Sequence, residues 1–418
     1  MKYSIQERES RFSELKRSPG IILMFLLLAA GAFMGASMGV SAAEEAEELT
    51  VRCVFTSNAK TKDFSSLTDG NLGTWYPMND KKGWLEVEAP SPVGGVSVSM
   101  ADKYGMYPIS YDVEIEDGNG EWVSCAKSRY LVDWYTFENP VSRFRLKATS
   151  KERIRIAEMR VFGPGEKPEE VQDWKELEKC DMMLLACHPD DEVLWFAGLL
   201  PTYAGERGYK VQVAMMTPRN GERQLELLSC VWHCGVRYYP YFIGFHDKHG
   251  GSISRQYTAW KGKNRVMKLV TECFRKYKPE VVVTHGVEGE YGHSAHRVTS
   301  EAARLCVEYA AKKSSFPESV KKYGTWQVKK LYLHEYDKNQ IVMDWDQPLA
   351  AFGGKTGFDV AEEAFQYHAT QTARDWVFTR KGEHDNTLFG LYFTAVGEDT
   401  GLNDFMENID LNYEENEL

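Results

Sequence analysis

Residues 182–192 read Met-Met-Leu-Leu-Ala-Cys-His-Pro-Asp-Asp-Glu, an apolar run that leads into a His and three carboxylates. Such a run, followed by a helical pattern, predicts a buried parallel strand whose carboxyl end carries a ligand-binding loop. Pro189 has a fixed φ and stiffens the turn that carries His188 and Asp191. An imidazole and a carboxylate three residues apart can bind one Zn²⁺, which leaves Asp190 free as a base. The alternative is an ordinary helix N-terminus, where the dipole favours acidic residues, but it explains neither His188 nor Pro189.

A second strand exit supplies further candidates. The apolar run Val281–Val283 ends in a loop rich in Gly and Glu. His293 and His296 follow at the start of a helical pattern, and three residues apart on a helix they share one face. We expect the third metal ligand from this pair, whereas His285 is more consistent with a core or surface residue.

With these two motifs the chain resembles the PIG-L (LmbE-like) N-deacetylase family. The resemblance is specific at residues 188–192 and 289–296 and extends more loosely from about residue 180 to about residue 408. It implies a Rossmann-like zinc enzyme that removes acetyl from N-acetylglucosamine-type amides. Carried over, it makes three residues the zinc ligands: His188, Asp191 and His296. The same resemblance makes Asp190 the general base.

Further roles follow from the same resemblance. His293 and Tyr291 match residues of the family that stabilise the tetrahedral intermediate or donate a proton near it. Substrate contacts are expected from three residues: Arg223, Asp247 and His368. His368 opens a His-x-x-Gln pattern that Gln371 completes. The chain departs from the family at Ala295, where many members carry Asp before the last His, and this puts the tuning of His293 in doubt.

These assignments predict a hydrolysis. Zinc polarises the amide carbonyl and lowers the pKa of water to ~7, and Asp190 takes the proton of that water. Tyr291 or protonated His293 stabilises the oxyanion, and Asp190 or His293 protonates the departing amine. Two alternatives remain: a zinc hydrolase for another bond, such as an O-acetyl ester or a thiol-conjugate amide, and an inactive glycan-binding protein.

Residues 1–42 predict a secretory signal peptide. Basic residues precede an uncharged apolar run from about Gly20 to Val40, and Val40-Ser41-Ala42 fits a cleavage site. The run of about 21 residues is also long enough to span a bilayer, so an uncleaved anchor is the alternative. We expect a secreted or extracytoplasmic protein, which meets a membrane only if this segment is retained.

The composition argues against some classes of binding partner and against a fold held together by disulfides. The formal net charge of −11 at pH 7 argues against nucleic acid and anionic lipid. The eight cysteines are scattered, contain no CxxC pair and are too sparse for a disulfide scaffold. Only Cys53 and Cys125 share the N-terminal region, where they are a candidate disulfide.

Residues 48–165 predict an all-β module. Short alternating or aromatic-rich runs are separated by Gly, Asn, Asp and Pro, which indicates a β-sandwich of jelly-roll type. Residues 67–75 and 156–163 resemble a discoidin (F5/8 type C) galactose-binding-like module. That resemblance implies carbohydrate binding and a structural Ca²⁺ held by three residues: Asp69, Thr74 and Glu158. A plain Asp-Gly turn explains Asp69 equally well.

Aromatic residues are frequent in this module, and most of them are expected in its core. Trp75 and Trp84 in particular are predicted to be core residues. The alternative is a surface on which sugar rings stack their C–H faces, and Trp134 is open to either role.

After a linker over residues 166–176, residues 177–408 alternate between apolar runs and helical patterns. Strands are expected up to residue 187 and over 210–217, 237–245, 281–284 and 331–336. Helices are expected over 194–208, 223–234, 260–277, 296–311 and 360–371. This alternation predicts a parallel sheet in a doubly wound α/β fold, which would bring His188 and His296 to one edge. Residues 409–418 are an acidic tail.

Overall fold

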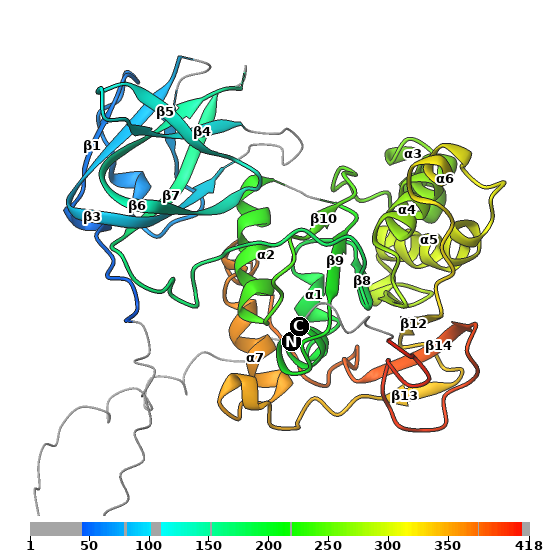
Figure 1. Cartoon of the computed structure of the whole chain (residues 1–418). Coiled ribbons are helices and arrows are strands. Elements are labelled where there is room, and N and C mark those ends of the chain that lie inside the picture. The colour runs from blue at the N-terminus through cyan, green and yellow to red at the C-terminus, as the bar shows by residue number, and fades with distance from the viewer. Residues whose placement is uncertain are drawn as a thin grey trace, which may run out of the picture. The chain divides into compact units, whose positions relative to one another are not determined.

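A seven-stranded antiparallel sheet forms the N-terminal region of the computed structural model (blue to cyan in Figure 1). The structure describes residues 44–78, 82–101, 110–150, 153–217, 220–374 and 376–411. The strands of this sheet are β1 (Val54–Ser57), β2 (Tyr76–Met78), β3 (Trp84–Met100), β4 (Tyr111–Glu116), β5 (Trp122–Lys127), β6 (Val132–Ala148) and β7 (Ile154–Phe162). The all-β prediction for this region is confirmed.

The sheet is one continuous surface, whereas the predicted sandwich has two separate sheets. The long strand β3 changes partner along its length, since residues 85–88 pair with β1 and residues 95–100 pair with β7. Its register with β6 breaks between Glu88 and Gly95, and such irregularities bend a strand. The two halves of the sheet therefore share β3 and β6 and enclose one apolar core.

Three expectations for this module are wrong. Trp84 is only partly buried and is not part of the apolar core. Trp75 is 46% exposed and lies under the Arg155 guanidinium, because its neighbour Tyr76 takes the inward position on β2. Cys53 and Cys125 carry free thiols, as all eight cysteines do. Cys125 lies exposed on β5, and the Cys53 thiol donates to the carbonyl of Leu49 instead.

A second seven-stranded sheet follows, with the order β10-β9-β8-β11-β12-β14-β13. Its strands are β8 (Met182–Ala186), β9 (Val211–Met215), β10 (Tyr241–Phe242), β11 (Val281–Thr284), β12 (Lys330–His334), β13 (Gln340–Val342) and β14 (Leu388–Thr394). The run from β10 to β12 is parallel, as predicted. The other edge is antiparallel, because β14 returns beside β12 and then pairs with β13.

Helices cover both faces of this sheet (Figure 1). They are α1 (Asp191–Leu194), α2 (Gly221–His233), α3 (Ile253–Ala259), α4 (Lys263–Tyr277), α5 (Ser294–Ala311), α6 (Pro317–Tyr323), α7 (Gly357–Phe365) and α8 (Ala369–Thr372). Met182 and Leu184 pack into the core shared with α2 and α7, whereas Met183 and Leu185 pack into the core shared with α4 and α5. Burial on both faces explains why β8 is apolar at every position.

Three predicted elements differ in extent. The helix expected over 360–371 is split into α7, which ends at Phe365, and α8, which begins at Ala369. The helix expected over 194–208 is interrupted, since α1 ends at Leu194, Ala197 has φ of 33°, and a separate π-helical turn begins at Pro201. The strand expected over 237–245 keeps only the two residues of β10.

The described residues between 44 and 411 belong to one compact unit, in which Tyr130 of the first region stacks on Tyr239 of the second with ring centroids 4.2 Å apart. Among the described residues, no helix is long and apolar enough to cross a membrane. The signal peptide predicted over residues 1–42 lies outside the described residues, as does most of the acidic tail.

Candidate metal and hydrolase site

The candidate site forms where two neighbouring parallel strands end. Leu185 of β8 lies opposite Thr284 of β11, so the loops that leave both strands start side by side. The first loop carries His188 and leads into α1, and the second leads into α5, whose first turn carries His296. Strand pairing thus brings together two histidines that are 108 residues apart in the chain.

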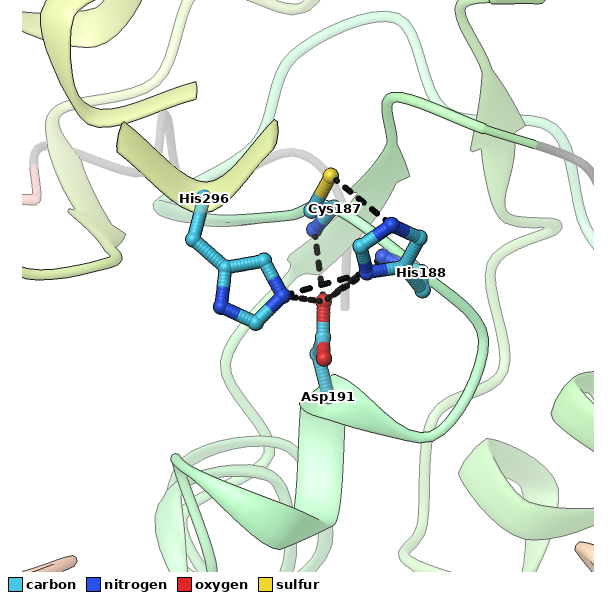
Figure 2. A group of neighbouring side chains, drawn as sticks. All are labelled: Cys187, His188, Asp191 and His296. Carbon is cyan, nitrogen blue, oxygen red and sulfur yellow. Dashed lines mark hydrogen bonds and ion pairs between the residues drawn. The ribbon is translucent and has the colours of Figure 1, made fainter. Parts of the chain in front are cut away.

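Three donor atoms converge there (Figure 2). Nδ1 of His188 lies 3.1 Å from Nε2 of His296 and 3.2 Å from Oδ2 of Asp191. Nε2 of His296 lies 3.4 Å from the same carboxylate oxygen. The Cys187 thiol completes a group of four buried side chains, with Sγ 3.5 Å from Nε2 of His188.

The spacing of these atoms fits a zinc ion. Zinc binds His nitrogen and carboxylate oxygen at ~2.0–2.2 Å with tetrahedral geometry, which separates neighbouring ligand atoms by ~3.3–3.6 Å. The three separations of 3.1, 3.2 and 3.4 Å are close to that range. Two imidazoles and one carboxylate are also the kind of ligand set that catalytic zinc sites use.

Asp191 is held as an ionised carboxylate. Its Oδ2 accepts the backbone N–H groups of Cys187 and His188, and its Oδ1 accepts the indole N–H of Trp195 at 2.9 Å. Burial alone would raise the pKa of Asp191, but His296 and His188 hold it well below its usual range. The carboxylate therefore keeps its charge and its orientation.

Glu290 lies behind the histidines and accepts hydrogen bonds from three of them. The Nδ1 atoms of His285, His296 and His334 lie 2.6, 2.8 and 2.8 Å from its carboxylate oxygens. Burial would raise the pKa of Glu290, but His285 and the other two imidazoles hold it well below its usual range. Because the carboxylate accepts the Nδ1 proton of His296, Nε2 of that ring is left to face His188 and Asp191. The expectation that His285 is a core residue holds, since its side chain is fully buried.

Asp190 occupies a strained backbone position beside these residues. Its φ is 125°, a conformation that costs a residue other than glycine free energy and that clusters at functional sites. Its carboxylate lies 3.0 Å from the Arg223 guanidinium. Burial raises the pKa of Asp190 to about 6, and Arg223 opposes that rise.

A buried Glu–His pair holds the backbone of Asp190. The N–H of Asp190 donates to Oε2 of Glu192 at 2.8 Å, and Oε1 of Glu192 lies 2.5 Å from Nε2 of His368. Glu226, fixed by the backbone N–H and the hydroxyl of Thr370, lies near both His368 and Arg223. Residues 368–370 therefore support the catalytic loop from a segment 176 residues further along the chain.

The cavity in front of these residues has a volume of about 510 Å³. Most of the expected site residues border it: His188, Asp190, Asp191, Asp247, Tyr291 and His293. Arg223 and His368, expected to contact substrate, do not border it, because both are buried behind Asp190. Gln371, which lies within α8, does border the cavity.

His293 has a partner that the sequence did not indicate. Its Nε2 lies 3.1 Å from Nδ1 of His249, on the loop after β10. Burial, together with the nearby His296 and His188, lowers the pKa of His293 to about 3. The structure therefore favours a neutral imidazole at this position, which can hydrogen-bond but carries no positive charge. Ala295 packs into the apolar core.

The candidate calcium residues lie together in the N-terminal module. The Thr74 hydroxyl donates to Oδ2 of Asp69 at 2.8 Å. Burial and the adjacent Asp69 carboxylate raise the pKa of Glu158 to about 7. Two carboxylates held this close favour a shared proton or a shared cation. Calcium binding stays a prediction, which titration calorimetry with CaCl₂ tests directly.

Comparison with known families and proteins points to deacetylases. Residues 183–307 match the PIG-L family, described as GlcNAc-PI de-N-acetylase. A 1D-myo-inositol 2-acetamido-2-deoxy-alpha-D-glucopyranoside deacetylase of Catenulispora acidiphila is 23% identical over 208 residues, covering 43% of this chain and 63% of that protein. The corresponding deacetylase of Corynebacterium urealyticum is 29% identical over 163 residues, covering 30% of this chain and 48% of that protein. The chain spans less than two thirds of the length of either relative.

Two solved structures are similar to parts of the chain. The N,N'-diacetylchitobiose deacetylase of Pyrococcus horikoshii aligns with a TM-score of 0.37 and 18% identity over 46% of this chain and 71% of its own. The family 32 carbohydrate-binding module of Clostridium perfringens NanJ, in complex with galactose, aligns with a TM-score of 0.24 and 18% identity over 28% of this chain and 98% of its own. The segment that carries the candidate site is thus similar in sequence to the PIG-L deacetylases.

The geometry predicts that replacing His296 removes the metal. His296→Ala deletes one of three converging donors, so elemental analysis should find zinc reduced to a small fraction of one equivalent while circular dichroism shows a folded chain. His233→Ala, which lies away from these donors, should keep full zinc. Full occupancy in folded His296→Ala would contradict the ligand assignment.

A second prediction concerns the support of Asp190. His368→Leu removes the donor to Glu192 and should lower kcat by about 10²-fold, because a small misplacement of a reacting group is that costly. KM and zinc content should stay near wild type. His368→Gln, whose amide can still donate, should recover most of the loss. Unchanged kcat in folded His368→Leu would show that the pair does not position Asp190.

Proposed function

We propose that this protein is a zinc-dependent hydrolase that removes acetyl from N-acetylglucosamine-type amides of a glycan or glycoconjugate. The observation that carries the proposal is the convergence of His188, Asp191 and His296 beside a further carboxylate, Asp190, next to a cavity. The named deacetylase relatives act on 2-acetamido sugars, which supports this class of substrate.

Amide hydrolysis needs an activated water and a stabilised oxyanion. Zinc bound by the three donors would supply Lewis acidity, which polarises a carbonyl and lowers the pKa of water to ~7. His188, Asp191 and His296 would hold the ion, and because His188 and Asp191 border the cavity, water and substrate would reach it from there.

In this proposal Asp190 accepts the proton of the attacking water. Asp190 borders the cavity, Arg223 pairs with its carboxylate, and Glu192 accepts its backbone N–H. The same carboxylate can return that proton to the departing amine, because His293 is neutral and has no extra proton to give. Arg223 thus orients the base in this proposal and does not bind substrate.

The oxyanion requires hydrogen-bond donors at the cavity wall. Tyr291 and His293 both border the cavity, and their rings lie 5.5 Å apart. A tyrosine hydroxyl, whose ordinary pKa is ~10, keeps its proton at neutral pH, so Tyr291 can donate a hydrogen bond. A neutral N–H of His293 would add a second donor.

Two alternatives to this function remain. A zinc hydrolase of O-acetyl esters or thiol-conjugate amides would use the same residues. An inactive glycan-binding protein is less consistent with the structure, since the donors, the base and the residues that hold them are all in place.

We also propose that the enzyme works outside the cytoplasm, with the N-terminal module binding glycan. The basis is the signal-like segment over residues 1–42 and the all-β region that follows it. Binding through two sites would raise the effective concentration of a polymeric substrate. N-terminal sequencing of exported protein should begin near Ala43, and a soluble cytoplasmic chain that keeps Met1 would contradict export.

Replacing the base tests the mechanism. Asp190→Asn keeps the shape of the side chain but cannot accept a proton, so acetate release from N-acetylglucosamine compounds should fall by roughly 10²–10⁴ while zinc is retained. Asp69→Asn, in the N-terminal module, is the matched control and should leave turnover on small substrates unchanged. Turnover near wild type in zinc-loaded Asp190→Asn would place the base elsewhere.

A further inference from the structure

Three aromatic rings border the candidate cavity, and two of them are unusually exposed. The ring of Trp195 lies 5.7 Å from that of Tyr291 and 6.5 Å from that of Trp376, and the Tyr291 and Trp376 rings are 5.8 Å apart. Tyr291 is 50% exposed and Trp376 is 39% exposed. Large aromatic surface left in water next to a reactive site marks a place for a ligand.

This aromatic wall (Trp195, Tyr291 and Trp376) is fixed to the candidate site. The indole N–H of Trp195 donates to Asp191, one of the three converging donors. Tyr291 directly follows Glu290 and has φ of 43°, and its backbone N–H donates to His384 at 2.9 Å. The three rings are inclined to one another by 48°, 87° and 47°, so a sugar ring stacked on the face of one of them would lie beside the candidate site.

Arg374 borders the same cavity and is exposed. Within the described part of the chain, no carboxylate forms an ion pair with it. The other charged groups of the cavity have partners, since Asp190 lies 3.0 Å from Arg223 and Asp247 lies 3.6 Å from His188. Arg374 is thus a cation available to a ligand.

We propose that the aromatic wall binds the face of a sugar ring and that Arg374 binds a negatively charged oxygen group on the unit joined to it. The apolar C–H face of a pyranose suits an aromatic surface, and a guanidinium suits carboxylate or phosphate oxygens. The substrate is then an anionic N-acetylated glycoconjugate. This inference rests on the proposed function and narrows its substrate class.

Carboxylates at the border of the cavity restrict an anionic group of the substrate to the position beside Arg374. Asp190, Asp191 and Asp247 all border the cavity, and the chain carries a formal net charge of −11. An anionic substrate would be repelled by these carboxylates unless a cation stood at its binding position. Arg374 is placed to supply that cation.

The inference is tested with the full, zinc-loaded chain and three substrates: methyl N-acetylglucosaminide, N-acetylglucosamine 1-phosphate and an N-acetylglucosaminyl uronate. Wild type should hydrolyse at least one anionic compound with kcat/KM about tenfold above that of the neutral glycoside. The phosphate and uronate arms show which anionic group is preferred. Arg374→Met should remove the preference, and Arg374→Lys should keep part of it.

Matched variants distinguish the effect of losing part of the aromatic wall from the effect of any surface substitution. Trp376→Ala should raise KM about tenfold for all three compounds with little change in kcat. Tyr367→Ala and Arg255→Met, exposed residues that do not border the cavity, should behave as wild type. Equal kcat/KM for all three compounds in wild type, or a preference that survives in Arg374→Met, would overturn the inference.

A binding measurement keeps this inference separate from the proposed function. If wild type releases acetate from none of the compounds, the deacetylase proposal fails. Titration calorimetry with glucosamine 1-phosphate and with glucosamine then decides the subsite alone. Tighter binding of the phosphate in wild type, lost in Arg374→Met, would support it, and equal binding would overturn it.

Discussion

The parallel pairing of β8 with β11 is the constraint on which the site depends. It sets the exits of the two strands side by side, and only there can His188 meet His296. Both strands are apolar and buried on both faces, so the packing of two cores fixes their register. A slip of one residue would turn the side chains of either strand to the opposite face and separate the two loops.

Buried carboxylates then turn this meeting point into a rigid site. Asp191, Glu290 and Glu192 each accept two or more hydrogen bonds. Together they hold the backbone at 187–190 and the rings of His285, His296, His334 and His368. Side chains in such a fully hydrogen-bonded network are already ordered, so they lose little conformational freedom when a ligand binds. Removal of one partner would leave a buried charge unpaired and cost its full desolvation free energy. Strain at Asp190 persists because these contacts surround it.

Local spacing pointed to His188, Asp191 and the pair His293 and His296, since each lies at a strand exit and an α/β topology joins those exits. The family resemblance then selected His296 from the pair. The Glu192–His368 contact, the His249–His293 contact and the position of Trp376 could not be predicted, because each joins segments that only tertiary packing brings together.

The same limit applies to β14, whose antiparallel return carries no local signal. A β-rich N-terminal region was predictable from alternation, but the partner change within β3 was not. The break at Ala197 likewise lacks a sequence signal beyond the nearby Pro201.

Removal and return of the metal test the central claim most directly. The purified chain would be dialysed against a chelator, assayed for acetate release from N-acetylglucosamine compounds, and assayed again after titration with Zn²⁺. The account predicts that activity falls to the background rate and returns in full at one equivalent of zinc, because the three donors form one site. Undiminished acetate release from metal-free protein would contradict it.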